Sequence, residues 1–129
     1  MQENNSTRSI RQLQFEHENQ AWERSLEFFK QENILLKYRL SEMVDNIEEN
    51  NFLQMAEYFQ NELLMKDEIL NELTKCLQEL SGKIPGGNGE QGAKRKNRKR
   101  DGLRQDILQF EKKFLVFAKD FNERLIHNI

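Results

Sequence analysis

The apolar residues between positions 22 and 77 form two rows that mirror each other about the bond joining Glu49 and Asn50. Each row advances by alternating steps of four and three residues, the 3.5-residue repeat of helices that pack side by side. The first row is Trp22, Leu26, Phe29, Asn33, Leu36, Leu40, Met43 and Ile47, and the second is Phe52, Ala56, Phe59, Leu63, Lys66, Leu70, Leu73 and Leu77. If the chain folds back at Glu49–Asn50, every residue meets one whose number completes a sum of 99. The pattern therefore predicts an antiparallel hairpin of two long helices.

A third row with the same spacing follows: Leu103, Ile107, Phe110, Phe114, Phe117 and Phe121. Because so apolar a helix is marginal alone in water, we expect it to dock along the hairpin, parallel to the first helix and antiparallel to the second. Second apolar stripes favour this third neighbour; they comprise Ala21, Phe28, Leu35, Met55, Ile69, Cys76, Leu108 and Leu115. Two registers of the third helix against the second keep the rows in contact, with residue numbers that add to 187 or to 180.

The three rows predict an all-α fold, an elongated antiparallel up-down-up three-helix bundle built from a coiled-coil-like helical hairpin and a third helix. We expect one domain spanning 1–129, with no strand, because Val- or Thr-rich alternation is missing. The expected helices are about 8–47, 51–82 and 101–128, with a flexible basic connector at 83–100. Ser9 and Gln12 have the spacing of a capping box, and Gly82 suits the position after a helix.

One polar layer interrupts the hairpin rows, where Asn33 and Lys66 share the sum of 99. A buried polar step is costly unless it is matched, so it disfavours slipped pairings of the two helices. We therefore interpret Asn33 and Lys66 as a register-setting polar layer; the alternative is a contact with a ligand or partner in the middle of the bundle.

Positive charge is concentrated in residues 94–100, although the formal net charge is only −2. Six of these seven positions are cationic: Lys94, Arg95, Lys96, Arg98, Lys99 and Arg100. Such a run is typical of a solvated loop whose charge is balanced by the acidic helices. There are two functional alternatives. The run could bind nucleic acid or another polyanion, with release of counterions, or it could serve as a docking tag or nuclear signal.

Neither histidine has the neighbours of a bundle-core metal site, which needs Glu-x-x-His pairs on facing helices. The residue three positions before His17 is Gln14, and the residue three positions before His127 is Arg124, so neither histidine has the glutamate of the motif. The predicted bundle also separates the two histidines by about 33 Å or more. Cys76 lacks a nearby histidine to activate it as a nucleophile. We therefore predict that the chain is not an enzyme and has no metal or cofactor.

The expected location is the cytoplasm, without a membrane contact. The N-terminal residues 1–9 are polar and are not followed by the apolar run of a secretory signal. No stretch approaches the roughly 20 apolar residues that span a bilayer. A single cysteine, Cys76, fits a reducing compartment.

The first two predicted helices, about half of the chain, resemble a group of small bacterial cytosolic proteins predicted to be all-helical. The resemblance is carried by Trp22-Glu23, Leu26-Glu27-Phe28-Phe29-Lys30, Glu32-Asn33, Leu36, Arg39-Leu40, Ala56-Glu57 and Phe59-Gln60-Asn61. It implies the helical hairpin. The group has no assigned activity, so the resemblance implies no functional residues.

These observations favour a non-enzymatic helical interaction or scaffold protein, whose protein partner the sequence does not identify. Stripes left uncovered, such as Phe28 and Leu35, suggest a homodimer in which a second copy covers them. Polyanion binding through residues 94–100 is the alternative function.

Overall fold

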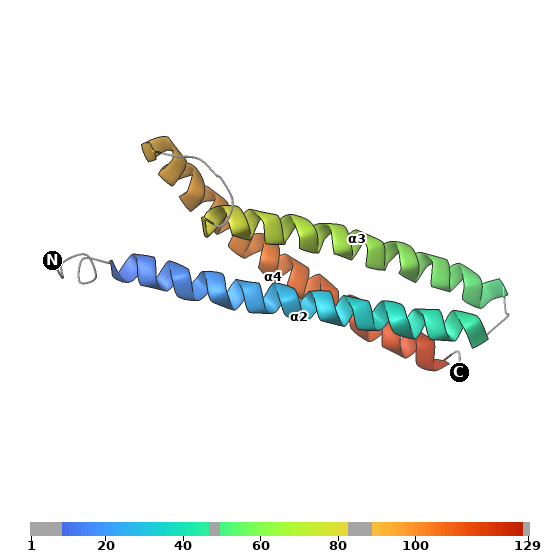
Figure 1. Ribbon diagram of the computed structural model, residues 1–129. Coiled ribbons are helices and arrows are strands. Elements are labelled where there is room, and N and C mark those ends of the chain that lie inside the picture. The colour runs from blue at the N-terminus through green and yellow to red at the C-terminus, as the bar shows by residue number, and fades with distance from the viewer. Residues whose placement is uncertain (1–8, 47–49, 83–88, 128–129) are drawn as a thin grey trace.

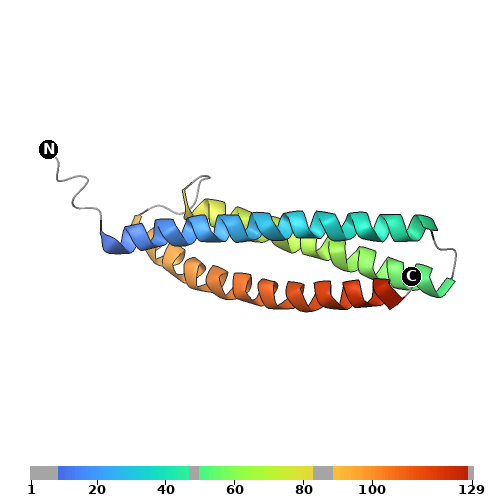
Figure 2. The ribbon, with the colours of Figure 1, turned by 90° about the horizontal axis from the view of Figure 1, so that it is seen from below.

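The computed structural model describes residues 9–46, 50–82 and 89–127, which form three helices: α2 (Ile10–Asn46), α3 (Asn50–Leu80) and α4 (Gly89–His127). No strand occurs among these residues. The helix α3 returns antiparallel to α2, and α4 runs parallel to α2 along the pair (Figures 1 and 2). The predicted all-α, elongated up-down-up three-helix bundle is therefore confirmed.

Two helix ends are fixed by local hydrogen bonds that the sequence predicts. The Ser9 hydroxyl accepts a bond from the Gln12 amide at 3.0 Å, and the Gln12 side-chain oxygen accepts one from the Ser9 amide at 3.2 Å. This reciprocal pair is a capping box, which satisfies amides left unpaired at the start of α2. After α3, Gly82 adopts φ +79° and donates its amide to the Glu79 carbonyl at 3.3 Å. A residue without Cβ takes this left-handed conformation at little cost.

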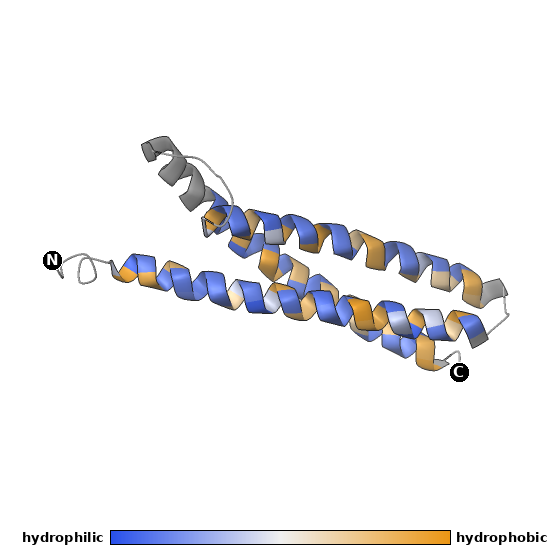
Figure 3. Ribbon diagram, in the orientation of Figure 1, coloured by the Kyte–Doolittle hydropathy of each residue, from blue (hydrophilic) through white to orange (hydrophobic). Residues whose placement is uncertain are grey.

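The core is built from the three predicted rows. Every member of the second and third rows is buried, as are Trp22, Leu26, Phe29, Asn33, Leu36 and Leu40 of the first row. Met43 is partly buried, and Ile47 lies outside the described residues. Apolar residues recur between hydrophilic ones along all three helices (Figure 3). Full burial of a phenylalanine such as Phe59, at 0% exposure, contributes roughly 1.5–3 kcal/mol to stability.

Aromatic packing selects one of the two registers expected for α4. The Phe59 ring lies edge-on to Phe117 and Phe121, with centroids 5.8 and 4.9 Å away. Near the other end of α3, Lys99 and Glu79 form an ion pair of 3.5 Å. The numbers of these contacting residues add to 176–180, and those of the cation–ring pairs Lys66–Phe117 and Arg124–Phe59 add to 183. The contacts are therefore centred on the register of 180 and not on that of 187.

The helix α4 begins at Gly89, whereas the sequence predicts a flexible connector up to Arg100. That boundary is wrong for residues 89–100, and residues 83–88 lie outside the described part of the chain. The physical reason is that Ala, Lys, Arg, Glu and Gln dominate this segment and are good helix formers. In addition, Arg100 stands seven residues before Ile107, on the buried face of α4, and is only 5% exposed.

The second apolar stripes do not hold α4 in place, contrary to expectation. Met55 and Cys76 pack against the core. The other large members, Phe28, Leu35, Ile69, Leu108 and Leu115, remain 40–61% exposed. The cause is that the row of α4 packs against both hairpin rows, which remain in contact with each other, so one row from each helix is enough. Phe29 illustrates this, because its ring packs on Phe110 and Phe114 of α4 at 5.6 and 5.1 Å.

The polar layer is buried, but its two predicted members do not bond to each other. The Asn33 amide, at 0% exposure, donates to the Leu63 carbonyl at 3.0 Å and to an Asp67 carboxylate oxygen at 2.8 Å. Asp67 also pairs with Lys37. Lys66 Nζ contacts Glu62 at 3.3 Å and lies 3.9 Å from the centre of the Phe117 ring. The layer therefore joins α2 to α3 through Asp67, and its register-setting role stays a prediction.

Lys66→Leu is expected to stabilise the protein by about 1 kcal/mol, raising the melting temperature by roughly 3–6 °C. The replacement removes an ammonium whose side chain is 11% exposed, and it fills the same space with apolar atoms. Thermal unfolding followed by circular dichroism measures the effect. Lys75→Leu, at an exposed position of α3, is the control and should give no comparable gain. A lower melting temperature for Lys66→Leu would show that the Glu62 and Phe117 contacts outweigh the cost of burying the charge.

Candidate functional site

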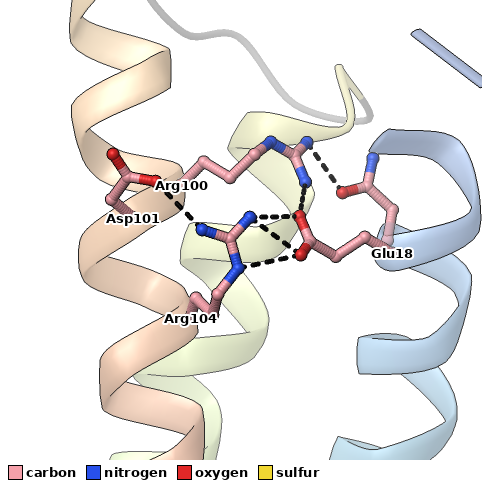
Figure 4. Close-up of polar contacts among 5 residues, drawn as sticks. Glu18, Arg100, Asp101 and Arg104 are labelled. Carbon is pink, nitrogen blue, oxygen red and sulfur yellow. Dashed lines mark hydrogen bonds and ion pairs between the residues drawn. The ribbon is translucent and has the colours of Figure 1, made fainter. Parts of the chain in front are cut away.

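The densest polar cluster lies near the start of the bundle, where two arginines of α4 meet one carboxylate of α2. Arg100 Nη1 lies 2.7 Å from Glu18 Oε1, and Arg104 Nη2 lies 2.9 Å from the same oxygen. Arg104 Nε donates to the second carboxylate oxygen of Glu18 at 2.9 Å. Both guanidinium groups point from α4 toward Glu18, and Asp101 contacts Arg104 from its own helix (Figure 4). We call Glu18, Arg100 and Arg104 the arginine clamp.

Aromatic rings and a side-chain amide complete the surroundings of Arg100. Its guanidinium carbon lies 4.1 Å from the centre of the Phe15 ring and 5.5 Å from that of Trp22. Its second terminal nitrogen donates to the Asn19 side-chain oxygen at 2.9 Å. The planar guanidinium suits both contacts, because it stacks on aromatic faces while its edge donates hydrogen bonds.

The arginine clamp is electrostatically satisfied from within the chain. The hydrogen bond to Glu18 raises the pKa of Arg104 further above its ordinary value, with desolvation opposing and the Glu18 charge adding to the rise. The Glu18 carboxylate accepts from both arginines, and Arg100, at 5% exposure, is enclosed. Such charge-assisted bonds position helices well, whereas a ligand would have to break them. We therefore interpret the clamp as a structural joint between α2 and α4.

The structure places the predicted polyanion-binding residues in different environments. Arg100 is not available to a polyanion, which corrects its assignment: its place in the buried row, seven residues before Ile107, is the sequence signal that reveals this. Lys99 is paired with Glu79 at 3.5 Å, although its side chain is 48% exposed. The side chains of Lys94, Arg95, Lys96 and Arg98 lie outside the described residues, while their backbone belongs to α4.

Residues that could ligate a metal ion are not clustered in the part of the chain that the structure describes. No three His, Cys, Asp or Glu residues there could hold a metal ion. His17 is exposed on α2, and the His127 side chain lies outside the described residues. Burial raises the pKa of the Cys76 thiol, and the Glu79 charge adds to the rise. The thiol is thus less reactive than an ordinary cysteine at neutral pH.

The surface between the helices consists of open grooves. One groove between α2 and α3 is lined by Leu40, Val44 and Leu64, with Lys37 and Asp45 among its polar residues. Another lies between α3 and α4, where Tyr58 and Val116 stand beside Lys112 and Lys113. Within residues 9–46, 50–82 and 89–127, no helix has the length and apolar character needed to cross a membrane.

Comparison with known proteins gives no match to a protein-family model, a curated protein or a solved structure. The resemblance of the first two helices to small bacterial helical proteins is not tested by this result and stays a prediction.

Glu18→Gln is expected to lower the free energy of unfolding by about 2 kcal/mol, because it leaves the enclosed Arg100 charge without a carboxylate. The loss of stability is expected to be smaller than for a fully buried ion pair, because the Glu18 side chain is 25% exposed. Urea unfolding followed by circular dichroism measures the loss.

Replacing both partners, Glu18→Leu with Arg100→Leu, should recover most of that stability, because the enclosed charge is then removed and Arg104, whose side chain is 38% exposed, keeps its ion pair with Asp101. Unchanged stability of Glu18→Gln would contradict a structural role for the clamp.

Proposed function

We propose that this chain is a non-enzymatic interaction protein that binds another protein through the outer faces of its helical bundle. The observation that carries the proposal is the number of large apolar side chains outside a core that is already filled. Val116 is 71% exposed, Leu115 and Tyr38 are 61% exposed, and Phe28 is 56% exposed. Isolated exposed apolar residues are ordinary, but repeated ones along a helix face are typical of a binding surface.

The groove between α3 and α4 supports this function at one specific place. Tyr58 and Met65 of α3 are 50% and 54% exposed, and they lie seven residues apart on one face of the helix. Val116 of α4 lines the same region together with Tyr58. An amphipathic helix of a partner protein fits such a groove, with its apolar side chains against these residues. We therefore place the first test of the function at Val116.

A photo-reactive benzoylphenylalanine in place of Val116 is expected to form an adduct of defined mass with a protein partner in cells. The same group in place of Gln105, exposed on the same helix, is the matched control. Once the partner is identified and purified, Val116→Glu should weaken its binding at least about tenfold, because a charge would enter an apolar contact. Equal labelling from both positions, or binding unaffected by Val116→Glu, would contradict the proposal.

Polyanion binding is the second candidate, favoured by one observation about the backbone. Residues 89–100 belong to the continuous helix α4, so the basic run is carried on a regular scaffold that is joined to the bundle. Cations on a helix bind phosphates without reading sequence, and the affinity falls with salt because counterions are released. With Arg100 held by Glu18, the four cations Lys94, Arg95, Lys96 and Arg98 are the proposed contacts.

Fluorescence anisotropy of labelled single- and double-stranded nucleic acid measures this second function. With four phosphate contacts, log K is expected to fall with log salt at a slope of roughly −3 to −4. Serine at positions 94, 95, 96 and 98 should abolish the salt-dependent binding. Serine at Lys112, Lys113 and Lys119, which are exposed on α4, should leave most of it. Binding that survives the first replacement, or that is missing at low salt, excludes the basic run as a polyanion site.

A further inference from the structure

The outer face of α2 carries a row of exposed residues with the same alternating steps of four and three as the core rows. We call it the outer row; it consists of Arg24, Phe28, Gln31, Leu35, Tyr38 and Glu42. All six are exposed in the structure, and its three large apolar members, Phe28, Leu35 and Tyr38, are 56%, 40% and 61% exposed. A 3.5-residue row on a helix is the pattern that packs against another helix, and nothing in the described chain covers this one.

The outer row is complementary to its own reverse. Suppose that a second α2 lies antiparallel on the first, with the two copies of Asn33 at the same level. Each residue then faces one in the other copy whose number completes a sum of 66, so Arg24 faces Glu42 and Phe28 faces Tyr38. Gln31 likewise meets Leu35. A second α2 laid antiparallel on the first would therefore match opposite charges at both ends and aromatic rings between them. This is the requirement of an isologous contact around a twofold axis, in which each pair occurs twice.

Contacts within the chain hold several members of the outer row in place. The Phe28 ring packs edge-on against the core residue Phe29, with centroids 5.4 Å apart. Gln31 donates its side-chain amide to Glu27 at 3.0 Å. A side-chain hydrogen bond to Glu42, with the Glu42 charge adding to the effect, raises the pKa of Tyr38. A surface ordered before binding loses less side-chain entropy when a partner docks.

The helix α4 widens the apolar surface beside the outer row. Arg39 of α2 donates to Asn122 of α4 at 3.1 Å, so the face of α4 that carries Asn122 is turned toward α2. Leu115 and Leu108 precede Asn122 by one and two heptads and share that face. They are 61% and 44% exposed. The surface around the outer row thus includes leucines of a second helix.

From the self-complementary order of charges and rings, we infer that the outer row of α2 binds a second copy of this chain. The two α2 helices are antiparallel, and the twofold axis passes at the level of Asn33. Two Arg24–Glu42 pairs close the ends of the contact, and Phe28 packs against Tyr38 of the second copy. This inference rests on the proposed function, that the outer faces bind proteins, and it assigns one of those faces to self-association.

Charge reversal tests the pairing, with the mass measured by light scattering or sedimentation over a range of concentrations. The wild-type protein is expected at twice the 15.5 kDa of one chain. Arg24→Glu alone and Glu42→Arg alone each place like charges opposite one another twice, so each should raise the dimer dissociation constant about tenfold or more. The two changes together restore opposite charges and should restore the dimer. Glu68→Arg, the same kind of change at an exposed position of α3, should leave the constant unchanged.

Spin-label distances test the antiparallel geometry without altering the outer row. Cys76 is first replaced by serine, so that spin labels attach only to cysteines introduced at chosen positions. A label at Gln20 lies 13 residues before Asn33, and a label at Asp45 lies 12 residues after it. At 1.5 Å per residue, equivalent labels in the two copies are about 39 and 36 Å apart along the axis, and labels at Ser41 about 24 Å apart. A parallel pair would give the same separation at all three positions and would overturn the inference.

Two further outcomes also overturn it: a wild-type protein that is monomeric at about 100 μM, and a dimer that withstands both single charge reversals. The second outcome would mean that the dimer forms through another surface and that the outer row binds a different protein or no protein. Failure here is distinguishable from failure of the proposed function, because the Val116 adduct reports on the groove between α3 and α4, which is lined by no residue of the outer row. A monomer that still forms that adduct removes only the self-association.

Discussion

The sharing of each apolar row by two neighbouring helices is the constraint on which the rest of this structure depends. Phe29 touches rings of α4 while its row faces α3, and Phe59 touches Phe117 and Phe121 while its row faces α2. One row per helix is therefore enough to close the bundle. Phenylalanine has no polar end to satisfy, so its rings can fill this shared core, while most of the flanking stripes stay exposed.

Charge is used differently at the last two positions of the basic run, Lys99 and Arg100. Arg100 is enclosed by Glu18, Asn19 and the Phe15 ring, and it ties the beginning of α4 to α2. Lys99 reaches Glu79 of α3 and remains about half exposed. Adjacent residues of the run thus differ, since Arg100 is enclosed in the fold and Lys99 is at the surface, where a polyanion would compete with Glu79 for it. The proposed interaction function draws instead on the outer faces of the helices, which these charges leave accessible.

The helical rows, the up-down-up order and the capping box at Ser9 follow from the sequence alone, because they depend on local spacing. The register of α4 does not, since Phe110 and Phe114 repeat at the same interval and either pairing keeps the rows in contact. It is decided by ring packing around Phe59, which is a tertiary contact. The clamp illustrates the same limit: Arg100 reads as part of a basic run until its position in the buried row of α4 is recognised. The spacing correctly predicts that Asn33 is buried, but its partner Asp67 stands one residue beyond the expected Lys66.

Asn33 has a mechanical consequence for the hairpin. Its amide is bonded to Leu63 and Asp67, and its side-chain oxygen has no hydrogen-bond partner among the described residues. Sliding α2 by one heptad along α3 would put Thr74 or Gln60 in the place of Asp67 and Leu73 or Phe59 at the level of Lys66. The bond from the Asn33 amide to a charged carboxylate would then be lost, at a cost of about 1.5–3 kcal/mol. We therefore expect the Asn33–Asp67 bond to disfavour a shifted pairing of α2 and α3, which would also change the length of the hairpin.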